Sequence, residues 1–133
     1  MQLENILYAG VQIVHNFGAA AVTGLPIAVL WFGLEQRAAL RAMAWLTLAA
    51  WLAQAASGAG FGAVSYFVVG ELPQIHHLAL AALITKIGCA FAAIALLGVA
   101  LFGAAAPSRK RWASLALLGS VALICAAILR WLS

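Results

Sequence analysis

The chain has 133 residues, of which 67% are hydrophobic and only 8% are charged. Soluble domains are usually about a quarter charged, so this composition excludes an ordinary soluble globular protein. The formal net charge is +4, but most of the basic residues gather in two short connections between apolar runs. That distribution is typical of membrane topology, and we expect no nucleic-acid partner.

Four apolar runs cover most of the chain, and each is expected to form a helix. They span residues 6–32, 43–69, 77–102 and 112–132. Each is as long as or longer than the roughly 20 residues with which a helix crosses a ~30 Å hydrocarbon core. The sequence therefore predicts an all-α integral membrane four-helix bundle, a single domain over residues 1–133 with the lipid bilayer around it.

The positions of the basic residues predict the orientation of this bundle. Five of them lie in the first and third connections: Arg37, Arg41, Arg109, Lys110 and Arg111. An excess of Lys and Arg in short loops marks the cytoplasmic side of a membrane. We therefore expect both termini, and the loop that carries His76 and His77, on the periplasmic or exterior side. The expected location is a bacterial inner membrane.

Two ionisable residues lie well inside the predicted spans. His15 is about nine residues into the first run, and Lys86 follows His77 by nine residues in the third. The two should therefore lie at similar depth in the membrane, where polar groups are costly and are usually functional. Helical spacing groups His15 on one polar, small-residue face that should point into the bundle: Gln12, His15, Asn16, Ala19 and Thr23.

The surroundings of Lys86 decide whether it can carry a charge inside the membrane. The nearest edge is too far for the side chain to reach, so we expect the amine to be neutral or hydrogen-bonded. The candidate partners are the amide side chains of Gln12, Asn16 and Gln54.

The three histidines can be interpreted in several ways. As ligands, His15 and either His76 or His77 could form an outward-facing site for copper or another transition metal, because imidazole suits such metals. A haem b held by two histidines between the first and third helices is a second interpretation. As structural residues, His15 would hydrogen-bond across the bundle, while His76 and His77 would lie at the water interface.

Other chemistry-bearing groups are sparse. The chain has no paired carboxylates, no Ser/His/Asp set and no phosphate loop, so we assign no catalytic residue and do not expect an enzyme. Cys89 and Cys125 lie in different predicted helices at different depths, which predicts small buried thiols rather than a disulfide. Trp112 and Trp131, at the two ends of the last run, are expected at the membrane interfaces.

Three motifs together resemble one known family. They are His15 followed by small residues, an arginine-led second run ending in Ser57-Gly58, and Lys86 within a leucine-rich third run. This pattern, which covers about 90 residues, is similar to the membrane module of the CopD-like copper-resistance family. A more distant similarity is to HemJ-type protoporphyrinogen oxidases, four-helix membrane proteins associated with haem b.

The resemblance implies a copper-handling membrane protein, active in copper resistance or uptake. In that interpretation His15, His76 and His77 bind the metal, and Lys86 lies beside His15 in the site. The alternative is a haem b redox protein in which His15 and Lys86 contact the cofactor. It would be either a membrane anchor that passes electrons to a quinone or, as the HemJ likeness implies, an oxidase. A third hypothesis is a non-catalytic accessory subunit, either in a homo-oligomer or in a larger membrane complex.

Overall fold

The computed structural model describes residues 2–70, 77–103 and 108–132, and this part of the chain is helical without strands. Its long helices are α1 (Gln2–Phe32), α2 (Arg37–Val64), α3 (His77–Phe102) and α4 (Arg109–Leu132). A short π-helical segment, η1 (Ser65–Val69), extends α2. The second predicted run, 43–69, therefore lies in α2 together with η1.

Among the residues that the structure describes, three helices are long and apolar enough to cross a membrane: α1, α3 and α4. This confirms a membrane protein with transmembrane helices. The helix α2 is not among these three. Its sequence contains Gln54, Ser57 and three glycines between residues 58 and 62, which make it less hydrophobic than the others.

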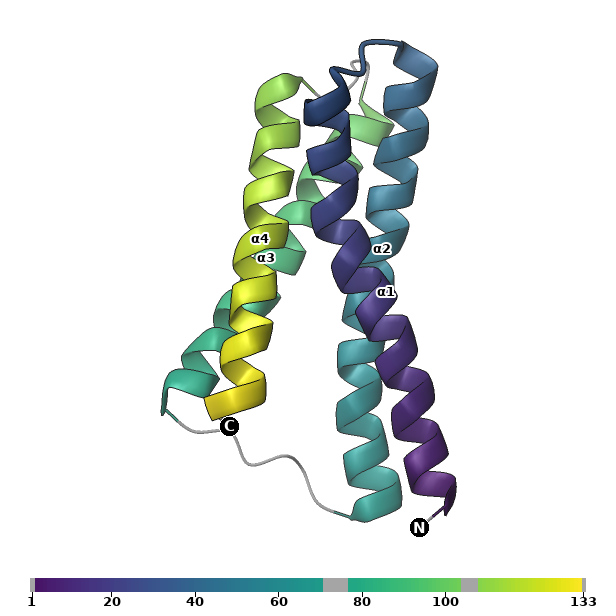
Figure 1. Ribbon diagram of the computed structural model, residues 1–133, viewed down its shortest axis with the longest axis vertical. Coiled ribbons are helices and arrows are strands. Elements are labelled where there is room, and N and C mark those ends of the chain that lie inside the picture. The colour runs from purple at the N-terminus through teal and green to yellow at the C-terminus, as the bar shows by residue number, and fades with distance from the viewer. Residues whose placement is uncertain (1, 71–76, 104–107, 133) are drawn as a thin grey trace.

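The helices form two antiparallel pairs, α1 with α2 and α3 with α4. Figure 1 shows that the pairs approach each other at one end and separate toward the end where both termini lie. We call this second end the diverging end. The turn between α1 and α2, residues 33–36, lies at the converging end.

The end of α1 is defined by Gly33. This residue has a φ of 59°, in the left-handed region that glycine tolerates and that commonly ends helices. The N–H of Gly33 donates to the carbonyl of Leu30, and the N–H of Leu34 donates to that of Val29. These bonds satisfy carbonyls at the end of the helix, and the chain then returns as α2 along α1.

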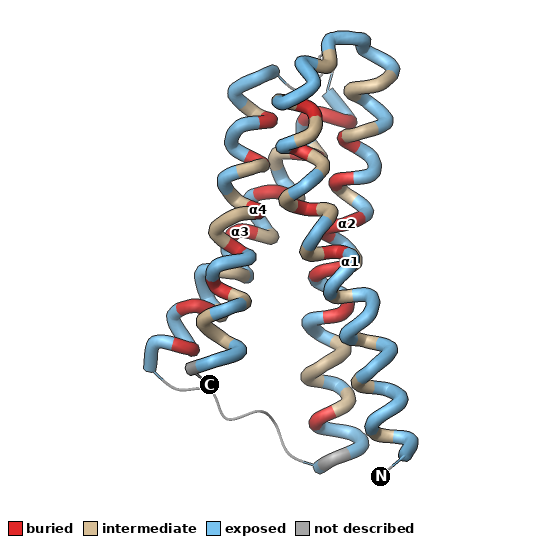
Figure 2. Tube along the Cα trace, in the orientation of Figure 1, coloured by how far each residue is buried: buried red, intermediate tan, exposed pale blue. Residues whose placement is uncertain are grey.

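The hydrophobic core lies where the two pairs converge, and Figure 2 shows buried residues facing one another there. Trp51 on α2 and Trp112 on α4 are among its largest members, each 1% exposed. The expectation that Trp112 lies at the membrane interface is therefore wrong. Because α4 begins at Arg109, Trp112 falls in its first turn, on the face that packs into this core. Trp131 is exposed, as an interfacial residue would be.

Gly119 allows the close approach of α4 to α1. A Cβ atom at this position would lie 2.5 Å from the carbonyl oxygen of Val22 and 3.1 Å from the Cα of Thr23. Both are backbone atoms, so a larger residue would force the helices apart. Small residues play this part in membrane proteins because helices there associate through close packing.

Toward the diverging end, α1 and α2 remain in contact with each other. The hydroxyl groups of Tyr8 and Ser65 are 2.7 Å apart. The Tyr8 ring also stacks on Phe61, with centroids 6.3 Å apart. Together, α2 and η1 therefore follow α1 along nearly its whole length.

Candidate functional site

His15 of α1 and Lys86 of α3 meet across the two helix pairs. The distance from Lys86 Nζ to His15 Nε2 is 3.0 Å, within hydrogen-bonding range, and both side chains are half-buried. The expectation that these residues lie at similar depth and face each other is confirmed. The contact links the pair α1/α2 to the pair α3/α4 on the diverging side of the core.

The second ring nitrogen of His15 is held by Ser57 of α2, with Nδ1 2.7 Å from Oγ. The Ser57 hydroxyl donates to the carbonyl oxygen of Gln54 at 3.2 Å. Since its single proton is used there, Ser57 Oγ accepts a hydrogen bond from the Nδ1–H of His15. The network therefore assigns the proton to Nδ1 and leaves a lone pair on Nε2, to which Lys86 donates.

Gln54 supports the backbone at the same place. Its Nε2 donates to the carbonyl oxygen of His15, and the side chain is only 7% exposed. The ring of Phe61 meets the imidazole edge-on, with centroids 5.3 Å apart. The His15 ring is thus oriented by Ser57 and Phe61 of α2 and by one amine from α3, while Gln54 holds the His15 backbone.

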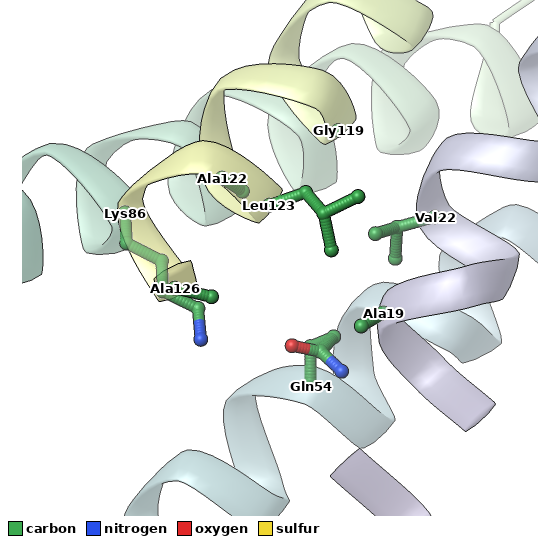
Figure 3. A pocket seen from close by; sticks show the side chains of 8 residues that line it. All are labelled: Ala19, Val22, Gln54, Lys86, Gly119, Ala122, Leu123 and Ala126. Carbon is green, nitrogen blue, oxygen red and sulfur yellow. The ribbon is translucent and has the colours of Figure 1, made fainter. Parts of the chain in front are cut away.

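A small pocket adjoins the pair. It lies between the four helices, and Lys86 and Gln54 are the polar residues in its lining (Figure 3). The other lining residues are apolar or small: Ala19, Val22, Gly119, Ala122, Leu123 and Ala126. An amine from one helix pair and an amide from the other therefore face a common space that is otherwise apolar.

The expected amide partners of Lys86 are only partly correct. Gln12 and Asn16 are exposed and bond to each other, at 2.6 Å between Nε2 and Oδ1. Gln54 does lie near Lys86, across the pocket, but without a direct hydrogen bond among the described contacts. The amine instead bonds to His15 itself.

Sequence reasoning missed Ser57 as a partner of His15. A signal for it was present, because the short turn after α1 makes α2 antiparallel and brings residue 15 opposite residues 54–57. Ser57 is one of the few residues in that stretch whose side chain can accept a hydrogen bond. Hydropathy and helical spacing do not give the rotation of one helix against another, and that rotation selects Ser57.

His77 is separate from His15. His77 begins α3 with an uncommon positive φ of 55°, nine residues before Lys86. That spacing corresponds to about 13.5 Å along the helix, too far for His77 and His15 to bind one ion while Lys86 contacts His15. His76 lies outside the described residues. Within the described ranges, no three or more His, Cys, Asp or Glu residues form a group able to hold a metal ion.

The two cysteines lie on α3 and α4, the helix pair that also carries Lys86. Cys89 on α3 and Cys125 on α4 are buried free thiols. Because α3 and α4 are antiparallel, the two thiols lie at similar heights in the molecule, so the expectation of different depths is wrong.

No protein-family model matches the chain, and comparison with curated proteins and with solved structures finds no match.

Proposed function

We propose that the protein handles copper at the outer side of a bacterial inner membrane. His15 is the innermost nitrogen ligand, and Lys86 takes the place of the ion when no metal is bound. The observation that carries this proposal is the 3.0 Å contact between Lys86 Nζ and Nε2 of His15. The family resemblance described above supports copper as the ion.

The imidazole has the arrangement expected of a metal ligand. A ligating histidine usually donates its other N–H to an oxygen, which sets the tautomer and the orientation of the ring. In this chain the Nδ1–H of His15 donates to Ser57 Oγ, so Nε2 is available as the donor atom. Imidazole nitrogen binds copper well.

Lys86 competes with the metal for the same lone pair. An amine N–H and a copper ion cannot both occupy His15 Nε2, so metal binding requires Lys86 to withdraw. If the amine is protonated, its charge also repels a singly charged copper ion, by about 1 to 4 kcal/mol at 4 Å for effective dielectric constants of 80 to 20. Lys86 therefore weakens binding and promotes release, which suits a protein that passes its ion on.

In this proposal, His76 and His77 bind copper first, before it reaches His15. His76 precedes His77 in the sequence. His77 begins α3 on the side where both termini lie (Figure 1), about 13.5 Å from Lys86 along the helix axis. Copper would be captured at the surface and then transferred to His15, so each step uses its own small ligand set.

The topology that goes with this function has four spans, with both termini outside. The helix α2, with η1, stays beside α1 from the Gly33 turn to the Tyr8–Ser65 contact. If α1 crosses the bilayer, α2 must therefore cross it too. The positive-inside rule then assigns the Arg-bearing converging end to the cytoplasm.

The haem b alternative finds less support in this arrangement. The other described imidazole, His77, lies about 13.5 Å from Lys86 along the helix axis, so His77 and His15 do not flank one haem while Lys86 contacts His15. The accessory-subunit alternative gives the His15 network no role in metal binding. The copper-binding experiment described next therefore separates it from copper handling.

Copper binding by the purified protein in lipid nanodiscs tests the proposal. We expect bound copper, measured by elemental analysis after desalting, to fall to background in His15→Ala. Lys86→Leu should retain copper and bind it more tightly, on the order of tenfold, because the competing amine is gone and leucine brings no metal ligand of its own.

Thr85→Val is the matched control. Thr85 neighbours Lys86 but is exposed, and its hydroxyl bonds to the carbonyl of Ala81 in its own helix. Its copper content should equal that of the unmodified protein. Equal copper in His15→Ala and Thr85→Val, or no copper in any variant, would overturn the proposal.

A further inference from the structure

The pocket between Lys86 and Gln54 has polar atoms whose hydrogen-bonding capacity is not used by protein groups. A lysine amine carries two or three N–H bonds, and the one hydrogen bond of Lys86 to a described residue goes to His15. The amide of Gln54 donates through Nε2 to the backbone of His15. Figure 3 shows its carbonyl oxygen turned toward Lys86.

These two groups select the chemistry of a ligand. Lys86 presents a donor to the pocket, and Gln54 presents an acceptor. Rotating the Gln54 amide would reverse this, but it would also break the bond to the His15 backbone. A ligand that fits must accept from Lys86 and donate to Gln54, as a hydroxyl group or water does and as a simple anion does not.

The size of the pocket selects among such ligands. Its volume is about 10 Å³, close to the lower limit of 10–15 Å³ that one water molecule needs. A buried water also needs at least two polar partners, and the pocket provides two. Gln54 itself is only 7% exposed.

We propose that one water molecule binds in this pocket and bridges Lys86 Nζ to Gln54 Oε1. It joins the two helix pairs a second time, next to the direct contact between Lys86 and His15. The bound water is also the proton-exchange partner of Lys86, trading one proton for another without net transfer. This site does not depend on copper and goes beyond the proposed function.

Solid-state NMR on the protein in lipid bilayers tests this site directly. The chain contains two lysines, Lys86 and Lys110, so labelling lysine Nζ with ¹⁵N gives two signals. Lys110→Arg removes the exposed one and leaves Lys86. We expect clear transfer of magnetisation from water protons to Lys86 Nζ in this background.

Filling the pocket should abolish that transfer. Ala126 lines the pocket, and Ala126→Val adds two methyl groups to a side chain there. Ala127 is the next residue and is exposed, so Ala127→Val adds the same volume outside the pocket and should leave the transfer unchanged. Helical circular dichroism and thermal unfolding show whether each variant is folded.

A second variant keeps the test decisive if Ala126→Val does not fold. Gln54→Met preserves the approximate length of the side chain but removes the acceptor, and the transfer should drop several-fold. The proposal is overturned if Lys86 shows no contact with water in the unmodified pocket, or if neither variant changes it. Because no copper is added, the result is independent of the metal-binding experiment.

Discussion

Gly18 of α1 lies directly against the Gln54 side chain of α2. A Cβ atom at position 18 would be 2.8 Å from Gln54 Nε2 and 3.2 Å from its Cγ. This is the same amide that holds the His15 backbone. The absence of a side chain at Gly18 therefore gives Gln54 the room to reach His15.

Gly18→Ala should move the Gln54 amide without unfolding the protein. Alanine favours a helix over glycine by about 1 kcal/mol, and losing one hydrogen bond costs a similar amount. The free energy of unfolding should therefore change little, while the ¹⁵N signals of Gln54 and His15 shift. Gly10→Ala is the control, because a Cβ there meets nothing within 4 Å, and it should leave both signals in place.

Gly119→Ala should destabilise the contact between the helix pairs. The new Cβ would clash with the backbone of Val22 and Thr23, and relieving such overpacking typically costs about 1–3 kcal/mol. Unfolding in detergent by a denaturant measures the loss. Gly24→Ala, where the added Cβ has open space, should be neutral or stabilising. If Gly119→Ala were as stable as Gly24→Ala, the close crossing of α1 and α4 would be wrong.

Ser57→Ala should change the tautomer of His15. Without the hydroxyl acceptor, the proton on Nδ1 loses its partner, and a larger share of the rings will carry the proton on Nε2. The ¹⁵N chemical shifts of the two ring nitrogens distinguish these forms. Because partners of this kind hold a ligating histidine in place, copper affinity should fall by roughly 10–100-fold.

Ser120→Ala is the control for that change. Its hydroxyl donates to the carbonyl of Ala116 in its own helix, so its loss does not reach His15. The tautomer and the copper affinity should both match those of the unmodified protein. Identical ring signals in Ser57→Ala would mean that Ser57 does not orient the imidazole.

Labelling of single cysteines tests the four-span topology. In a background with Cys89→Ala and Cys125→Ala, the variants Gln2→Cys and Ser108→Cys put one thiol at each end of the molecule. An impermeant maleimide added to intact cells should label Gln2→Cys and leave Ser108→Cys unlabelled until the membrane is opened. Labelling of both positions from outside would exclude the proposed orientation.

Much of this protein is determined by local features of its sequence. Apolar runs and the charges between them predict the helices, because hydropathy and helix length are properties of each segment alone. The same argument predicts the common depth of His15 and Lys86, since depth follows from counting residues along a helix. The expectation for Trp112 failed because a residue near the end of a helix can face either the core or the lipid.

Only the tertiary structure decided which side chains meet. The bond from Lys86 to His15, and the role of Ser57 as the acceptor, depend on how one helix is rotated and shifted against the next. The separation of His77 from His15 also became clear only once Lys86 was found against the imidazole. Rotation and crossing of helices are determined by close contacts such as Gly119 against Val22. Such contacts join residues far apart in the chain, so no local pattern contains them.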